Sequence, residues 1–272
     1  MFRIQSNNKQ LIYMEVLMNI YNDFKGQMGH ANVTNQYIEM LSRIWEREYC
    51  YKEVDELSRS VGIMLSKIPE SIVERITKQY LIGIHSCIEV FLLNFKSLPG
   101  SPTYNKDYPS DKDESRLVWT VQNVFEKRTK EITELMNICE YYRLVRNSAV
   151  HSKSREDNKL KVAKSKIHLS VDSLETKIYG KLTAPNDLGA ITFDDQVLFS
   201  RAANLLVEKI YKESEYDWDV ALEEKRNEID IRTKSIYQKA KKKKKILKFM
   251  SGCYYINDDE LLKEAIDRLY LN

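Results

Sequence analysis

The sequence predicts an all-helical protein, and three observations favour this fold class. Only 8 glycines and 5 prolines occur among 272 residues, so few residues interrupt helices. Charged residues make up 31% of the chain, which is typical of long helices with solvated outer faces. Apolar residues also recur at spacings of three and four through most of the sequence. We therefore expect a helical bundle with extra helices at both ends and at most a short β-hairpin.

In the first part of the chain, the periodicity predicts three helices at residues 8–25, 32–66 and 69–98. We expect the first helix to end at Gly26 and Gly29, because glycine interrupts a helical pattern. Pro69 is compatible with the first turn of the third helix, where a missing N–H is tolerated. Residues 81–95 are apolar nearly all round, so this helix should be buried on most sides.

In the second part, the pattern predicts four helices at residues 114–152, 194–212, 217–250 and 258–271. Asp194 and Asp258 are expected to cap the second and fourth of these helices. Between the first two helices, apolar residues alternate with polar ones around Leu169, a pattern typical of strands. Any hairpin should therefore lie within residues 160–193.

The domain organisation follows from length and composition. The chain is long enough for one large domain or two small ones. We divide it into N-terminal helices packed on the core (1–75), a central helical domain (76–211) and a charged C-terminal extension (212–272). A net charge of only +3 does not by itself indicate nucleic-acid binding, so local clusters of charge decide this question.

Several classes of protein are disfavoured by what the sequence lacks. The four cysteines are far apart and form no C-x-x-C pair, which disfavours a disulfide framework or a zinc site and fits a reducing cytosol. No glycine-rich phosphate loop is present, which disfavours a nucleotide triphosphatase. The N-terminal residues lack a signal-peptide pattern, and the apolar stretch 80–95 is too short to span a bilayer. We expect a cytoplasmic protein that does not enter a membrane.

The most informative pattern is formed by Arg146, Asn147 and His151, at the polar end of the helix predicted over 114–152. On a regular helix Asn147 and His151 share a face, because they are four residues apart. Arg146 is about 140° around the helix from His151, within reach of its long side chain. An imidazole that titrates near neutral pH beside a permanent cation suits phosphodiester chemistry on RNA.

This pattern resembles the R-x4-H motif of the HEPN ribonucleases, a superfamily of small all-helical proteins. The resemblance covers roughly residues 76–211: a buried helix with an acidic residue, a long helix that ends in the motif, and a closing helix. An asparagine directly after the arginine is common in the family, and Asn147 matches it. The resemblance implies a bundle that forms a homodimer, in which two motifs face each other across a shared cleft.

The resemblance also implies an activity: metal-independent endoribonuclease cleavage that leaves a 2′,3′-cyclic phosphate. In this chemistry His151 takes the proton from a ribose 2′-hydroxyl, and Arg146 stabilises charge on the phosphorus. Asn147 orients the phosphate or the imidazole. No cofactor or metal is required. The expected biological role is a bacterial toxin or anti-phage defence effector, controlled by an inhibitory or activating partner protein.

Other charged residues receive supporting roles. Glu89 lies in the apolar stretch of the third helix, where an unpaired carboxylate is costly, so it either orients Arg146 or forms a salt bridge with a lysine. The expected RNA contacts are Arg143, Lys153, Arg155, Lys241, Lys242 and Lys243. The lysine run 241–245 also fits a solvated helix end that complements the helix dipole.

A structural alternative exists for the motif as well. Cations at the C-terminal end of a helix complement its dipole, so Arg146 and His151 are also compatible with a purely structural role. The corresponding functional alternative is a non-catalytic HEPN-like helical module that binds nucleic acid or a partner protein. His85, one turn before Glu89, is either part of the same polar seam or an ordinary core histidine.

Overall fold

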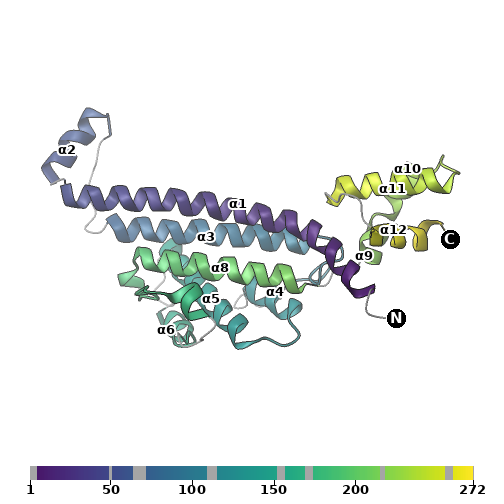
Figure 1. The fold of residues 1–272 in the computed structure, drawn as a ribbon. Helices are drawn as coiled ribbons and strands as arrows, with labels where there is room; N and C mark the ends of the chain where they lie inside the picture. The colour runs from purple at the N-terminus through teal and green to yellow at the C-terminus, as the bar shows by residue number, and fades with distance from the viewer. Residues whose placement is uncertain are drawn as a thin grey trace. The chain divides into compact units, whose positions relative to one another are not determined.

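The computed structural model describes residues 5–48, 51–63, 72–108, 115–151, 157–168, 174–214, 218–254 and 260–271. These residues form helices joined by turns and contain no strand, which confirms the all-helical prediction (Figure 1). The hairpin expected within 160–193 is not found among the described residues of that stretch, which exclude 169–173.

The helices are α1 (Gln5–Glu48), α2 (Tyr51–Ser60), α3 (Ile72–Ser97), α4 (Arg116–Val124), α5 (Lys130–His151), α6 (Asp157–Ser165), α8 (Phe193–Glu213), α9 (Trp218–Glu224), α10 (Arg226–Thr233), α11 (Lys239–Tyr254) and α12 (Glu260–Ile266). Short π-helical or 3-10 segments are η2 (Glu175–Tyr179), η3 (Leu188–Ala190) and η4 (Asp267–Leu271).

The chain divides into two compact units, each built from separate segments. Unit 1 comprises Met1–Phe24, Glu89–Lys127 and Val207–Asn272, and unit 2 comprises Lys25–Ile88 and Arg128–Leu206. The three parts predicted from the sequence are, in contrast, consecutive stretches of the chain. Helices α1, α3 and α8 contribute residues to both units, because the unit boundaries fall within these helices.

Helix α1 is one continuous helix of 44 residues, so the expected end at Gly26 and Gly29 is wrong. A glycine inside a helix costs about 1 kcal/mol relative to alanine, which weakens a helix without ending it. Phe24 and Met28 are almost fully buried on either side of Gly26. Their packing offsets the glycine penalty. Local helix propensity does not predict this stabilisation, because it comes from contacts with other helices.

Helix α2 ends six residues before the end predicted for the 32–66 helix. Gly62 has a φ of 74°, a left-handed conformation that glycine adopts without a steric penalty. Its N–H donates to Arg59 O, and the N–H of Ile63 donates to Ser58 O. This hydrogen-bond pattern satisfies the last carbonyls of the helix and ends it. The helix start predicted at Pro69 lies outside the described residues.

The helix predicted over 114–152 is divided into α4 and α5. Phe125 has an extended backbone (φ −109°, ψ 107°), and the exposed residues 126–129 connect the two helices. The side-chain oxygen of Ser115 caps α4 by accepting from the N–H of Val118, at 3.2 Å. Thr129 does the same for α5 with the N–H of Ile132, also at 3.2 Å. Helical spacing of apolar residues is present on both sides of this break, so the periodicity of the sequence does not reveal it.

The C-terminal region contains more and shorter helices than predicted. The expected helix over 217–250 is three helices, α9, α10 and α11, with breaks at Lys225 and at residues 234–238. Asp258, the predicted cap of the last helix, lies outside the described residues. As a result, the lysine run 241–245 lies at the start of α11, not at the end of a long helix.

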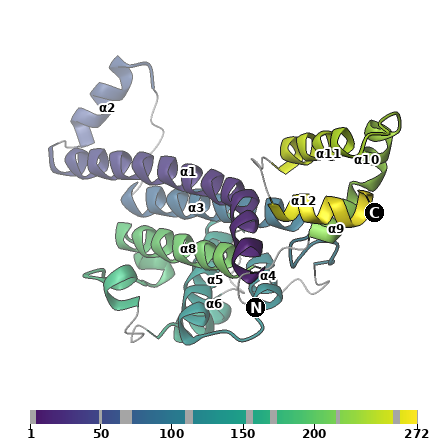
Figure 2. The ribbon, with the colours of Figure 1, turned by 45° about the vertical axis from the view of Figure 1, so that its right-hand side comes forward.

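The core of unit 2 is formed by α1, α3, α5 and α8. Helices α1, α3 and α8 run side by side, as both ribbon views show (Figure 2). The side chains of Leu81, Ile84, Ile138 and Leu198 are fully buried. On α3 the predicted burial holds for most of the apolar residues, whereas Val90 and Leu93 are exposed. By length and composition, Arg75–Ser97 of α3 is also able to cross a membrane, although half of its most apolar window is buried, as in many core helices.

Candidate active site

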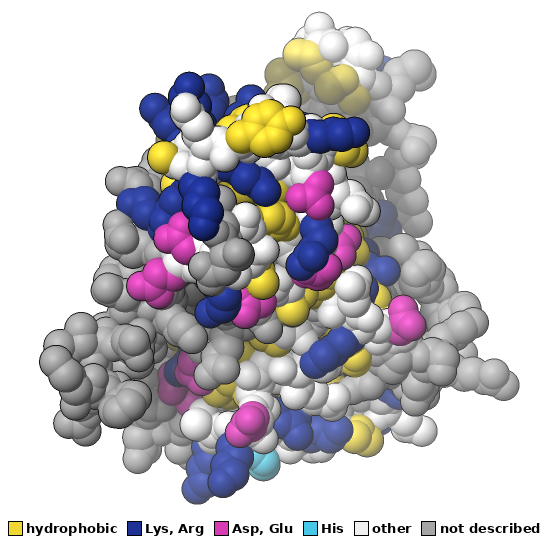
Figure 3. Space-filling view, turned by 90° about the vertical axis from the view of Figure 1, so that its right-hand side faces the viewer, with side chains coloured by type: hydrophobic (Ala, Val, Ile, Leu, Met, Phe, Trp, Pro, Cys, Tyr) yellow, Lys and Arg dark blue, Asp and Glu magenta, His cyan; other side chains and the backbone are white. Residues whose placement is uncertain are grey.

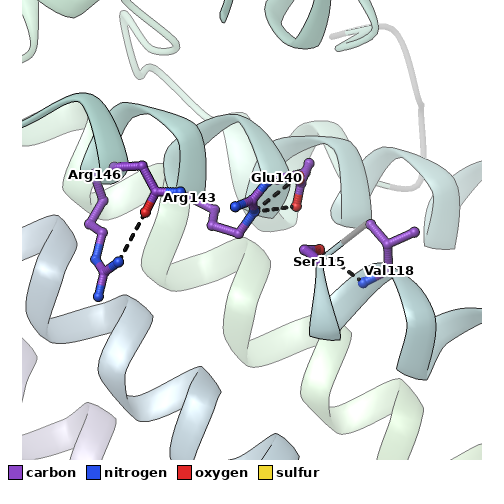
Figure 4. A network of polar contacts seen from close by, with 6 residues as sticks. Ser115, Val118, Glu140, Arg143 and Arg146 are labelled. Carbon is purple, nitrogen blue, oxygen red and sulfur yellow. Dashed lines mark hydrogen bonds and ion pairs between the residues drawn. The ribbon is translucent and has the colours of Figure 1, made fainter. Parts of the chain in front are cut away.

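Arg146, Asn147 and His151 lie in the last two turns of α5, so the helical spacing used to relate them is confirmed. Arg146 is partly exposed, and its Nη1 donates a hydrogen bond to Oδ1 of Asn147 at 2.9 Å (Figure 4). Its Nε atom is buried and has no hydrogen-bond partner within the described part of the chain. The side chain of His151 lies outside the described residues.

The guanidinium of Arg146 is therefore held by a neutral amide. Within the described residues, the hydrogen bond to Asn147 is the one contact that the structure gives to its donors. A guanidinium carries five N–H donors, and burial of an unneutralised cation is unfavourable. Such a side chain is stabilised most by binding an anion with several acceptor oxygens, such as a phosphate.

Arg143, one turn earlier on α5, is in a different state. Its Nε donates to both carboxylate oxygens of Glu140, at 3.0 and 2.9 Å, and its Nη2 approaches Oε1 at 2.5 Å (Figure 4). The charge of Arg143, an expected RNA contact, is therefore neutralised within its own helix. Lys153 and Arg155, two further expected RNA contacts, lie outside the described residues.

Asp195, in the first turn of α8, anchors the helix that carries the motif. Its Oδ1 accepts hydrogen bonds from the hydroxyl of Tyr142 and from the N–H of Asn186, both at 2.8 Å. Its Oδ2 accepts from the N–H of Thr192 at 2.8 Å, which caps α8. Burial, and then the charge of Asp195, raise the pKa of Tyr142, so this phenol remains a donor.

The predicted cap of α8, Asp194, has another role. Its Oδ2 accepts from the N–H and from the hydroxyl of Thr183, at 2.9 and 2.8 Å. Asp194 therefore ties the preceding loop to the helix, whereas Asp195 supplies the cap. Sequence inspection does not separate two adjacent aspartates at a helix start, because the choice depends on the path of the loop.

An open hollow of about 370 Å³ lies beside the first turn of α8, the turn that contains Asp195. It is lined by Gln36, Glu39, Met40, Arg43, Ile44, Arg47 and Phe193. Phe193 is the first residue of α8, and its ring packs edge-on against Tyr80 of α3 at a centroid distance of 6.1 Å. Through the contacts of Phe193 and Asp195, one end of unit 2 brings together α1, α3, α5 and α8.

Three buried polar atoms at this end have no hydrogen-bond partner within the described residues: Oε2 of Glu39, Nδ2 of Asn35 and the hydroxyl of Tyr80. Glu39 is 4% exposed, and its other oxygen accepts from Nε of Arg43 at 2.8 Å. Burial, and then the charge of Glu39, raise the pKa of Tyr80 to about 12. Unpaired buried polar groups are rare and often mark functional positions.

These three residues are not predicted from the sequence, although one signal for Glu39 is present. Glu39 is the single charged residue in the run Tyr37-Ile38-Glu39-Met40-Leu41. The same kind of signal, an acidic residue in an apolar stretch, singled out Glu89. Asn35 and Tyr80 carry no comparable signal, because their burial depends on packing between helices distant in sequence.

Glu89 accepts a hydrogen bond from Nη1 of Arg116 at 2.8 Å, within unit 1. This contact corresponds to the salt-bridge interpretation of Glu89, with an arginine in place of the expected lysine. Arg146 belongs to unit 2. His85 is buried on α3, as expected of a core histidine.

The lysines expected to contact RNA lie in the first two turns of α11. Lys243 forms an ion pair with Asp267, Lys242 lies 6.0 Å from the centre of the Tyr270 ring, and Lys241 is exposed. The interpretation of this run as a helix end that complements the dipole is wrong. The N-terminus of a helix is its positive end, where lysines are unfavourable.

Comparison with protein-family models, with curated proteins and with solved structures gives no match for this chain. The described residues contain no group of three or more His, Cys, Asp or Glu side chains placed to hold a metal ion.

Proposed function

We propose that the protein is a metal-independent endoribonuclease of HEPN type, acting as a homodimer in a bacterial toxin or anti-phage defence role. The observation that carries this proposal is the state of Arg146. This permanent cation is partly buried, held by the neutral amide of Asn147, and located five residues before His151 on the same helix. Arg143, fully paired with Glu140 in the preceding turn, lacks this property.

In the proposed reaction the nucleophile belongs to the RNA. His151 removes the proton of the 2′-hydroxyl, and the oxygen attacks the adjacent phosphorus. The 5′-oxygen of the next nucleotide leaves and takes up a proton, which gives a 2′,3′-cyclic phosphate and a 5′-hydroxyl end. Arg146 donates to the phosphoryl oxygens as negative charge increases on them, and Asn147 keeps the guanidinium in place.

An apolar face on α1 supports the homodimer. The α1 seam, as we call it, consists of Val33, Tyr37, Met40, Leu41 and Ile44, all of them exposed. Four of these residues follow one another at spacings of four, three and four, which is the pattern of a helix that packs against another helix. By contrast, the apolar residues of α3 and α5 are largely buried inside the bundle.

Identical helices fit the α1 seam better than an arbitrary partner. In a parallel pair, Arg43 of one helix faces Glu48 of the other at the edge of the seam, so opposite charges meet. The seam also lies beside the first turn of α8, because Met40 and Ile44 line the same hollow as Phe193. That turn contacts α5 through the hydrogen bond from Tyr142 to Asp195. A second copy bound to this face brings two motifs to the same end of the assembly.

The test is cleavage of a defined single-stranded RNA by the purified full-length chain in buffer with EDTA. We expect fragments that carry a 2′,3′-cyclic phosphate, identified by mass spectrometry. The same oligonucleotide with 2′-deoxy substitutions should remain intact, because the attacking hydroxyl is missing. Cleavage of the deoxy substrate, or loss of cleavage in EDTA, would contradict the mechanism.

A second candidate function, nucleic-acid binding without cleavage, is favoured by one further observation. The region around α10 and α11 concentrates positive charge, which supplies affinity for phosphates without any catalytic group. Tight RNA binding with no cleavage over hours at micromolar protein would favour this alternative.

A further inference from the structure

Positive charge is concentrated in one short segment of the chain. Residues 225–250 contain eleven Lys and Arg but only two Asp and Glu, a net charge of +9. Because the whole chain carries +3, the other residues together carry −6. The excess of positive charge is therefore local, and attraction to a polyanion should act mainly on this segment.

The folding of this segment directs the lysines outward. Ile229 of α10 and Ile246 and Met250 of α11 are buried, so these three apolar side chains face the interior of unit 1. Lys241, Lys244 and Lys245 are exposed on α11. Within the run 241–245, and among the described residues, only Lys243 has a carboxylate partner.

An exposed aromatic ring lies between the two helices. Tyr237, in the turn between α10 and α11, has 94% of its surface exposed, and Ile231 has 77%. Lys234 and Lys239 are exposed on either side of Tyr237 in sequence. Figure 3 shows Lys and Arg side chains gathered around exposed hydrophobic side chains on one face. Aromatic rings beside positive charges are the elements with which proteins hold single-stranded nucleic acids.

The observations favour a nucleic acid over a lipid surface. A helix that binds in a membrane interface inserts a continuous apolar face. On α11 that face is buried, since Ile246 and Met250 pack inside unit 1. Two exposed apolar side chains are too few for membrane insertion, whereas one ring is enough to stack on a base.

We propose that residues 225–250 form a binding surface for single-stranded RNA, in which Tyr237 stacks on an unpaired base and the lysines of α11 contact the phosphates. This inference rests on the proposed function for the identity of the strand as RNA. It adds a substrate-binding surface that belongs to unit 1, whereas Arg146 belongs to unit 2. Duplexes should bind more weakly, because paired bases do not offer their faces to Tyr237.

The test is fluorescence anisotropy of the full-length chain with a labelled single-stranded oligodeoxynucleotide, which lacks the 2′-hydroxyl and is not cleaved. Replacing Lys241, Lys244 and Lys245 together by Gln should weaken binding at least tenfold in low salt. It should also reduce the slope of log affinity against log salt by about 2, because each phosphate contact on a single strand contributes about 0.7. Replacement of three exposed lysines of unit 2, Lys166, Lys177 and Lys181, is the matched control and should change neither quantity.

Tyr237→Ala tests stacking separately from charge. We expect single-strand affinity to fall roughly 5- to 160-fold, the range typical for loss of one stacked aromatic, with the salt slope unchanged. Duplex affinity should stay the same. Equal losses for duplex and single strand would overturn the stacking role. Stronger binding of the chain to anionic vesicles than to the oligonucleotide, abolished by the same lysine changes, would overturn the RNA assignment in favour of a membrane.

The outcomes separate this surface from the cleavage proposal. If the oligonucleotide binds through α11 but RNA is never cleaved, the surface stands and the ribonuclease proposal fails. If RNA is cleaved at an unchanged rate by the triple lysine variant, and that variant binds like the wild type, the surface fails and the ribonuclease proposal stands.

Discussion

Arg146 and the lysine-rich segment 225–250 are both cationic, but their side chains differ in burial and in how they are held. Arg146 is partly buried, lacks an anionic partner among the described residues and is oriented by Asn147. The lysines of α11 are mostly exposed to solvent. A fixed, partly desolvated cation stabilises charge in a transition state, whereas exposed cations supply affinity that salt screens. The comparison therefore predicts that changes in the two regions affect different steps.

The largest effect should follow from changes at the motif. His151→Ala should reduce RNA cleavage by about 10²–10⁴-fold, because it removes the proposed base. Arg146→Ala should be similarly severe, and Arg146→Lys should restore little, because an ammonium lacks the planar pair of donors. Initial rates on a single-stranded RNA at saturating concentration measure these losses.

Two matched variants act as controls for these changes. His168→Ala and Arg128→Ala remove an exposed histidine and an exposed arginine, and both should cleave like the wild type. Circular dichroism should remain helical in every variant. A folded His151→Ala protein with full activity would refute the assigned base.

The next largest effect should come from changes in the α1 seam. In the proposed homodimer this surface holds the second protomer, which supplies the second Arg146–His151 motif. Tyr37 and Leu41 are 62% and 59% exposed, so Tyr37→Glu with Leu41→Glu should leave the monomer folded. Two carboxylates in an apolar interface are strongly unfavourable. We expect a monomer in sedimentation at micromolar concentration, and cleavage reduced at least tenfold.

Ile231→Glu is the control for this change, since it alters an even more exposed apolar residue, which belongs to unit 1. It should leave the sedimentation behaviour unchanged. A wild-type chain that sediments as a monomer at this concentration, yet cleaves RNA fully, would exclude the composite site.

A smaller effect is expected from Tyr80→Phe, which removes the unpaired hydroxyl near Glu39. The pKa of Tyr80 is about 12 in the folded protein and about 10 in an unfolded chain. Its contribution to stability is therefore complete below pH 10 and is lost as the pH rises from 10 through 12. The variant should lose less stability than the wild type between pH 9 and 11, measured by urea unfolding. An identical pH dependence in both proteins would contradict the burial of this phenol.

The smallest effect concerns Gly26, which lies inside α1. An added Cβ at this position meets no atom within 4 Å. Gly26→Ala should raise the free energy of unfolding by about 0.5–1 kcal/mol, because alanine is the better helix former. Cleavage and oligonucleotide binding should not change. Destabilisation on urea unfolding would show that α1 is not regular at this point.

The sequence predicts the helical fold well where a helix carries its own boundary signals. The end of α3 and both limits of α8 come within a few residues, because proline, glycine or aspartate marks them. The prediction fails at Gly26, where packing of Phe24 and Met28 overrides a local signal. It also fails at Phe125, where apolar spacing continues across a break.

In the candidate site, too, local features can be predicted from the sequence, whereas contacts between distant helices cannot. The placement of Arg146, Asn147 and His151 on one helix is local, and spacing predicts it, whereas the hydrogen bond from Arg146 to the adjacent Asn147 does not follow from helical spacing. The proximity of Tyr80, Phe193 and Glu39 depends on three helices that are far apart in sequence, so no spacing rule contains it. Glu39 is the exception, because a lone carboxylate in an apolar run marks the position even without its partners.

Asp195 should slow the hydrogen exchange of two backbone amides in the loop before α8. The backbone amides of Asn186 and Thr192 lie outside regular helix, yet both donate to this buried carboxylate. Loop amides normally exchange their hydrogens with solvent quickly, whereas these two should exchange as slowly as amides of the core. Because Tyr142 of α5 binds the same carboxylate, the deuterium uptake of this short peptide reports whether the end of the helix that carries Arg146 is intact.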